Sequence, residues 1–184
     1  MKLFIFIALV GCQMAWSQQN VRTVFVLRNS ETVSSAANAP LSPAGRKRAE
    51  CLAETLRNSG INHIFVSDVP ATQQTAAPLA AALTIKPSLI SARDTSTLVR
   101  DVLYSTGTAV VIADRLSLPV LLPRLEAGTV KPLGENEYDR LFVVTLVDGF
   151  GTPASSLRYC PAFSVPTGQP PLRQKQLARK PETR

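Results

Sequence analysis

Apolar residues along this chain form two kinds of pattern, which follow one another in turn: short continuous runs, and repeats at helical spacing. Continuous, mostly β-branched or aliphatic runs predict strands at 21–27, 61–67, 86–90, 108–113 and 141–147. Between these runs, helical spacing predicts helices starting near residue 42 and over 72–83, 97–104 and 116–126. Strands that alternate with helices predict an α/β domain, with three α/β/α layers around a mostly parallel sheet.

The first helix has the clearest boundaries. Ser42 is a suitable N-cap and Pro43 suits the first helical position. Ala49 and Leu52 begin an apolar face that continues at helical spacing, and Gly60 is a typical helix-end residue. We expect the helix over 72–83 to be kinked or divided at Pro78.

The two ends of the chain differ from its centre. Lys2 and the apolar run 3–10 are typical of a signal peptide over residues 1–17. That run is too short to span a bilayer, which takes about 20 residues. Two processing sites compete: cleavage after Ser17, or a lipobox that makes Cys12 a lipidated N-terminus. We therefore expect an exported protein, either periplasmic or membrane-anchored in a bacterial envelope.

The domain is predicted to cover residues 18–149, and residues 150–184 to form a basic, Pro-rich, largely disordered tail. Of the net charge of +7, residues 158–184 carry +5 and Lys2 carries +1, which leaves +1 for residues 18–157. A nearly neutral domain argues against nucleic acid as a partner. The tail either contacts anionic envelope surfaces or stays solvated.

Two cysteines remain once Cys12 is set aside. Cys51 lies on the predicted first helix and Cys160 in the predicted tail. An oxidising compartment would permit a disulfide between them. The sequence alone does not show whether their Cα atoms lie within bonding reach, and we expect two unpaired or merely buried thiols.

Five short segments share one resemblance. They are VLRNSE (26–31), LSPAGRKRAE (41–50), VSDVPATQQTA (66–76), VVIAD (110–114) and YDRLFVV (138–144). In this order they resemble the histidine phosphatase (phosphoglycerate mutase-like) superfamily over nearly the whole predicted domain. The resemblance implies the phosphoglycerate mutase-like fold.

The resemblance also implies a pocket of two arginines and two histidines, and the chain departs from it at three of these positions. Arg28 stands at the first arginine, but Asn29, Ala71 and Asp114 replace the nucleophilic histidine, the second arginine and the second histidine. An amide cannot form a covalent phosphoenzyme, and a carboxylate repels a phosphate dianion. The resemblance therefore implies a pseudophosphatase that acts by binding a ligand or an envelope partner.

Two other functions stay open. The first is a phosphatase or hydrolase with altered chemistry, which uses Arg28 with Asp114, Ser30 or Glu31. The second is an envelope interaction protein that uses its tail or lipid anchor. If a phosphorylated or anionic small molecule binds, we expect Arg28, Ser30 and Asp114 to contact it. We expect no cofactor and no metal, and the oligomeric state is undetermined.

Simpler structural roles are expected for three polar residues. Asp68 precedes the second helix and is expected to cap it. Asp114 is expected to form an ion pair with Arg28 across the pocket that the resemblance implies. His63, the only histidine, is expected to be a surface or half-buried structural residue.

Overall fold

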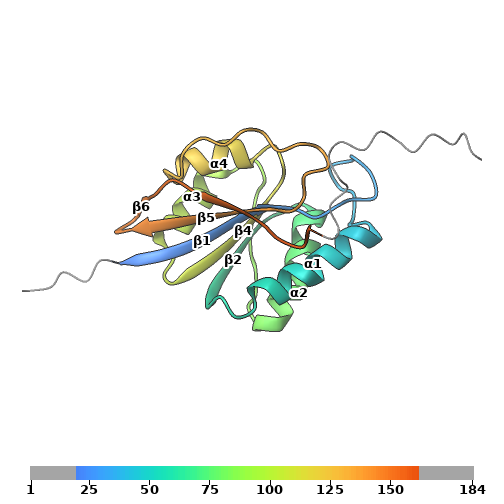
Figure 1. The fold of residues 1–184 in the computed structure, drawn as a ribbon, viewed down its shortest axis with the longest axis horizontal. Coiled ribbons are helices and arrows are strands. Elements are labelled where there is room, and N and C mark those ends of the chain that lie inside the picture. Colours follow the sequence, from blue (N-terminus) through green and yellow to red (C-terminus); the bar gives the residue numbers. More distant parts are fainter. Residues whose placement is uncertain (1–19, 162–184) are drawn as a thin grey trace, which may run out of the picture.

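A single mixed sheet forms the centre of the computed structural model, which describes residues 20–161 (Figure 1). Its strands are β1 (Val21–Arg28), β2 (Ile61–Ser67), β3 (Ser88–Ile90), β4 (Thr108–Ala113), β5 (Arg140–Val147), β6 (Phe150–Gly151) and β7 (Ser155–Arg158). The strand order is β3-β2-β4-β1-β5-β6, with β7 also paired to β5. The first four strands are parallel, whereas β5 runs antiparallel to β1 and pairs antiparallel with β6 and β7.

Helices cover both faces of this sheet. Helices α1 (Pro43–Leu56) and α2 (Pro70–Leu83) lie on one face, and α3 (Thr95–Tyr104) and α4 (Leu118–Arg124) lie on the other (Figure 1). The predicted three-layer α/β/α architecture is confirmed. Helix α2 continues through Pro78 without a break, and α4 is shorter than predicted.

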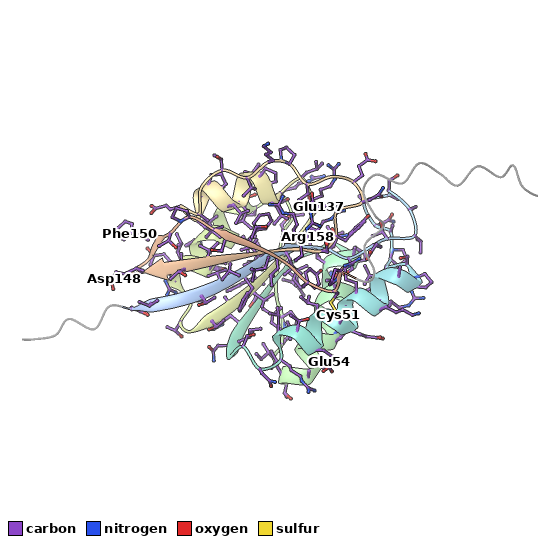
Figure 2. All side chains as sticks on the ribbon, in the orientation of Figure 1. Cys51, Glu54, Glu137, Asp148, Phe150 and Arg158 are labelled. Carbon is purple, nitrogen blue, oxygen red and sulfur yellow. A yellow bond between two sulfur atoms is a disulfide. The ribbon has the colours of Figure 1, made fainter. Side chains whose placement is uncertain are left out.

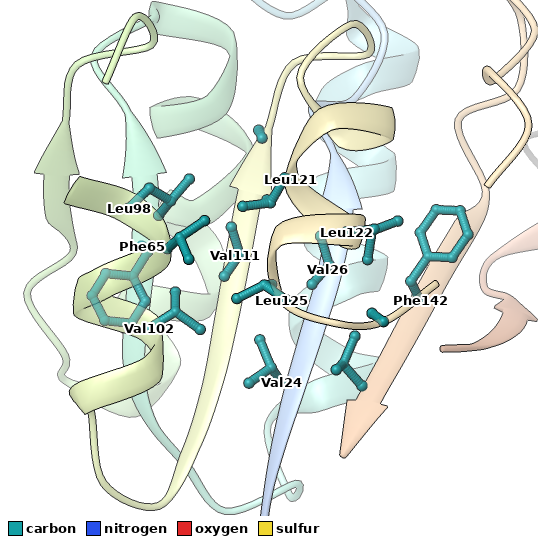
Figure 3. Close-up of a cluster of buried hydrophobic side chains, with 14 of the residues drawn as sticks. Val24, Val26, Phe65, Leu98, Val102, Val111, Leu121, Leu122, Leu125 and Phe142 are labelled. Carbon is teal, nitrogen blue, oxygen red and sulfur yellow. The ribbon is translucent and has the colours of Figure 1, made fainter. Parts of the chain in front are cut away.

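Alternation along the strands divides the core into two apolar clusters. Val24 and Val26 of β1 pack on the side of α3 and α4 (Figure 3). Leu27 faces the opposite way and packs with side chains of α1 and α2. Each fully buried side chain of this size contributes about 1.5–3 kcal/mol, so the two clusters hold the helices against the sheet.

The start of α1 follows the sequence prediction. The Ser42 hydroxyl accepts a hydrogen bond of 3.0 Å from the Gly45 backbone N–H. A side chain at Gly45 would collide with the Glu31 carbonyl, so the missing Cβ lets α1 approach the loop after β1. The predicted cap on the second helix is wrong: α2 has no side-chain cap, and the Asp68 carboxylate accepts from the Ala92 N–H at 2.9 Å.

The domain extends beyond residue 149. Strands β6 and β7 pair with the outer edge of β5, and Tyr159 is buried among the side chains of the α1–α2 cluster. The prediction of a tail from residue 150 is therefore wrong for residues 150–161. The rest of that tail, the signal peptide and the lipidation candidate Cys12 lie outside the described residues.

A disulfide joins Cys51 of α1 to Cys160, with Cα atoms 6.3 Å apart. The expectation of two unpaired thiols is wrong. The cause is long-range: β7 runs back along β5 and returns the chain to the α1 side of the sheet. Pairing between residues 109 positions apart depends on this return, which no local pattern encodes.

Candidate functional site

The four positions that the resemblance assigns to a pocket lie at the carboxyl edge of the sheet. Arg28 ends β1 in register with Ala113 of β4, and the Asn29 N–H donates to the Ala113 carbonyl at 2.9 Å. Asn29 and Asp114 therefore follow neighbouring parallel strands. Helix α2, which carries Ala71 in its first turn, lies beside them. Ligands of open α/β sheets bind at this edge.

Arg28 is covered by backbone. Its Nη1 donates to the carbonyl oxygens of Gly134, Glu135 and Glu137 at 3.3, 3.0 and 3.4 Å. Its guanidinium carbon lies 3.8 Å from the centre of the Tyr138 ring. Only 6% of the residue is exposed. Burial lowers the pKa of the Arg28 guanidinium, and the Tyr138 side chain opposes this shift.

Asn29 and Ser30 are turned into the protein. The Asn29 side-chain amide donates to the Ser30 carbonyl at 2.9 Å, and the residue is 9% exposed. The Ser30 N–H donates to the Thr75 hydroxyl of α2 at 2.9 Å. Ser30 is completely buried, which removes its hydroxyl from any ligand that approaches through solvent.

Asp114 does not pair with Arg28, so this expectation is wrong. Its carboxylate accepts from the Leu116 and Ser117 N–H groups at 2.9 and 3.0 Å, and from the Ser117 hydroxyl. Three donors from its own turn hold the side chain at the entrance to α4. Donors two and three residues along the chain bind the Asp114 carboxylate in place of the Arg28 guanidinium. Aspartate commonly binds such local donors in turns.

Ala71 belongs to the packing of the domain. It is buried and forms an apolar cluster with Leu41 and Ala49, against which Val69 packs. The position that the resemblance assigns to the second arginine of the pocket therefore carries no polar group. Its side chain takes part in an apolar contact between α1 and α2.

A buried ion pair next to the pocket was missed from the sequence. Arg48 of α1 is fully buried, and its Nε and Nη2 form hydrogen bonds of 2.7–3.0 Å to the Glu31 carboxylate. Its Nη1 donates to the Cys160 carbonyl at 3.3 Å. Helical spacing could have located this residue, because Arg48 lies one turn before Leu52 on the buried face of α1.

Tyr159 closes this network from the C-terminal side. Its ring centre lies 6.0 Å from the Arg48 guanidinium carbon. Its hydroxyl is buried without a well-formed hydrogen bond. Burial raises the pKa of the Tyr159 hydroxyl, while the nearby Arg48 charge and the contact with Ser30 work against this shift.

The acidic residues named above each have their own partners. Within residues 20–161 no three histidine, cysteine or acidic side chains lie close enough together to hold a metal ion, and no helix is long and apolar enough to cross a membrane. Of the acidic residues considered, Glu31 binds Arg48, and Asp68 and Asp114 hold backbone N–H groups. His63 is half-buried on β2 and stacks on Phe65, as expected of a structural histidine.

Comparison with known proteins gives a partial match to one family. The sequence model of the histidine phosphatase superfamily (branch 1) matches residues 23–92. Over these residues the chain is similar to that superfamily. The matched residues include Arg28, Asn29 and Ala71 but end before Asp114, whose place in the pocket rests on the adjacency of β1 and β4.

Curated proteins are similar to this chain over one segment. A probable phosphoglycerate mutase GpmB of Yersinia enterocolitica is 39% identical over 70 residues, which are 34% of this chain and 33% of that protein. The corresponding protein of Yersinia pestis is 40% identical over 60 residues, 29% of this chain and 28% of its own length. The match thus spans a third or less of these curated relatives.

Solved structures extend the likeness of the fold over most of the chain. The protein histidine phosphatase SixA, solved with tungstate, matches with a TM-score of 0.57 at 18% identity, over 74% of this chain and 96% of that one. A phosphoglycerate mutase from Bacillus anthracis matches with a TM-score of 0.59 at 14% identity, over 76% and 93%. These identities establish the fold only.

Proposed function

We propose that this chain is an exported, catalytically inactive member of the histidine phosphatase superfamily, which binds an anionic ligand or an envelope partner without transforming it. The observation that carries this proposal is Asn29. Its amide occupies the position of the nucleophile and has no basic lone pair with which to accept a phosphoryl group. Its burial and its hydrogen bond to the Ser30 carbonyl leave it facing the protein.

The surroundings of Asn29 support the same proposal. A phosphoryl-transfer site needs cationic or N–H donors aimed at the transferring oxygens. Arg28 donates instead to backbone carbonyls, and Ala71 supplies no donor. Loss of several groups that act together abolishes most of the rate even where one of them remains.

Export is supported by two independent features. Residues 1–17 have the pattern of a signal peptide. The Cys51–Cys160 disulfide fits an oxidising compartment, since cytosolic thiols are kept reduced. An envelope-facing protein with a phosphatase fold is the simplest description of both.

The hypothesis of altered chemistry has less support. Ser30 is completely buried, Glu31 is held by Arg48, and Asp114 accepts three hydrogen bonds from its own turn. None of the three is presented as a nucleophile. The hypothesis that the tail or a lipid anchor acts on its own concerns residues outside 20–161 and stays a prediction.

Hydrolysis of p-nitrophenyl phosphate by the full chain tests the proposal. We expect no turnover by the natural chain, by Arg28→Gln or by the matched control Arg57→Gln, which changes the exposed C-cap residue of α1. Turnover that disappears in Arg28→Gln but survives in Arg57→Gln, while both variants unfold cooperatively, would show an active pocket and refute the proposal.

A further inference from the structure

Two arginines point at the same short segment of backbone, residues 133–138, here named the cover loop. Arg28 is the last residue of β1, and Arg115 lies two residues past the end of the adjacent β4. Arg28 donates to three carbonyl oxygens of the cover loop. Arg115 donates from Nη1 to the Leu133 carbonyl at 3.2 Å. Two cationic groups from neighbouring strand ends thus donate to different carbonyl oxygens of the same segment.

The cover loop is an incomplete partner for this pair of charges. Guanidinium groups bind carboxylates and phosphates best, because a full negative charge and paired oxygens match their donors. Carbonyl oxygens offer only partial charge. The Arg28 Nε–H, moreover, is buried with no hydrogen-bond partner. The Asp114 carboxylate does not compensate, since it is occupied by its own turn. An oxyanion would give the buried Arg28 Nε–H an acceptor. It would also neutralise the two positive charges, which the uncharged carbonyl oxygens do not.

A second segment, residues 155–160, here named the strap, holds the cover loop from outside. Arg158 donates to the carboxylate of Asp139, the residue that follows the cover loop, at 2.7 and 2.8 Å, and to the Glu137 carboxylate within the loop at 3.3 Å. Figure 2 shows Arg158 beside Glu137, on the side of the molecule where Cys51 also lies. The Tyr159 N–H donates to the Asp139 carbonyl at 2.9 Å.

The disulfide fixes the far end of the strap. Cys160 is bonded to Cys51 of α1. The strap begins with the short edge strand β7, whose four residues are exposed, and its Tyr159 is buried in the α1–α2 cluster. Contacts therefore run in series from α1 through the disulfide and Arg158 to the cover loop and the two arginines. Loosening one end of this series weakens the closure at the other.

We propose that Arg28 and Arg115 form a masked site for an oxyanion such as a phosphate group, and that the disulfide-anchored strap keeps the cover loop closed over it. Arg115 supplies the second cation that Ala71 cannot. A dithiol opens the site by giving two electrons and two protons to the Cys51–Cys160 bond, which yields two thiols and leaves the dithiol as a cyclic disulfide. This inference rests on the proposed function, because it assigns the ligand class and the control of the same pocket.

Hydrogen exchange and titration with inorganic phosphate test the masked site on the full chain. On adding dithiothreitol we expect faster amide exchange in residues 133–138 and phosphate binding strengthened about tenfold or more, within the usual range of coupling between two sites. The gain should be lost in Arg115→Gln and kept in Arg57→Gln. Unchanged exchange, equal phosphate binding in both redox states, or a gain that survives Arg115→Gln would overturn the proposal.

Arg158→Gln keeps the inference testable if reduction unfolds the protein. This variant leaves the disulfide intact but removes the bonds to Asp139 and Glu137. We expect it to show faster exchange in the cover loop and tighter phosphate binding without any reductant. Exchange and phosphate binding equal to those of the natural chain would contradict the masked site. They would not affect the proposal that the protein is catalytically inactive, so the two proposals can fail separately.

Discussion

Replacing both Cys51 and Cys160 by alanine removes a covalent link between residues 109 positions apart. In the chain-entropy treatment, a closed loop of this length lowers the entropy of the unfolded chain by an amount worth about 4.8 kcal/mol at 25 °C. Native disulfides of small secreted domains typically contribute about 2–5 kcal/mol. With a urea dependence of about 2 kcal/mol per molar, the unfolding midpoint should fall by about 1–2.5 M.

Urea unfolding of the full chain, followed by far-ultraviolet circular dichroism, measures this loss. Dithiothreitol should lower the midpoint of the natural chain by a similar amount and leave the double alanine variant unchanged. A midpoint that moves by less than about 0.3 M in the double variant, or a reductant effect that persists in it, would refute the reasoning. The link would then add nothing to what the pairing of β7 with β5 already provides.

Three further changes probe the network around the pocket. Glu31→Gln removes the carboxylate that pairs with the buried Arg48 guanidinium and should cost about 3–5 kcal/mol in urea unfolding. The double variant Glu31→Leu with Arg48→Met should recover much of that, whereas a strictly additive loss would contradict the pairing. Burial raises the pKa of Tyr159, so its contribution to stability is complete below pH of about 10 and declines as pH rises beyond it. Tyr159→Phe should lack this decline between about pH 10 and pH 12, and an equally steep decline in the variant would argue against the shift. Gly45→Ala should cost about 1–3 kcal/mol, because the added Cβ meets the Glu31 carbonyl. Gly134→Ala, where a Cβ meets only ordinary contacts, is the control, and equal melting temperatures of the two variants would disprove the close approach.

The elements that local pattern determines could be predicted from the sequence. The apolar run over 108–113 became β4 with the same limits, because a strand covered on both faces needs continuous apolar residues. Ser42 and Pro43 started α1 as expected, since capping depends on neighbours within one helical turn.

Contacts between distant segments could not be predicted in the same way. The partners of Arg28 are carbonyl groups more than 100 residues away, and any backbone carries such groups. The pairing of Cys51 with Cys160 required the path of β7. Asp114 was assigned to Arg28 on charge alone, and the nearer N–H donors of its own turn decided its place.

The burial of Arg48 lies between these cases. Its position on the inner face of α1 follows from helical spacing. Its partner Glu31 lies in the loop after β1, so the ion pair depends on how closely α1 approaches that loop. Helical spacing alone indicates that Arg48 is buried. The close approach of α1 to the loop, which Gly45 permits, brings Glu31 to the Arg48 guanidinium.

Transfer of a phosphoryl group to the protein itself is the most direct test of the account. The full chain is incubated with a small phosphoryl donor such as acetyl phosphate, in the presence and absence of dithiothreitol. Its intact mass is then measured under neutral denaturing conditions that preserve phosphohistidine and aspartyl phosphate. An amide at position 29 predicts no phosphoryl adduct in either condition. An adduct that disappears in Asp114→Asn or in Arg28→Gln would contradict the account, because it would show that the pocket still transfers phosphoryl groups.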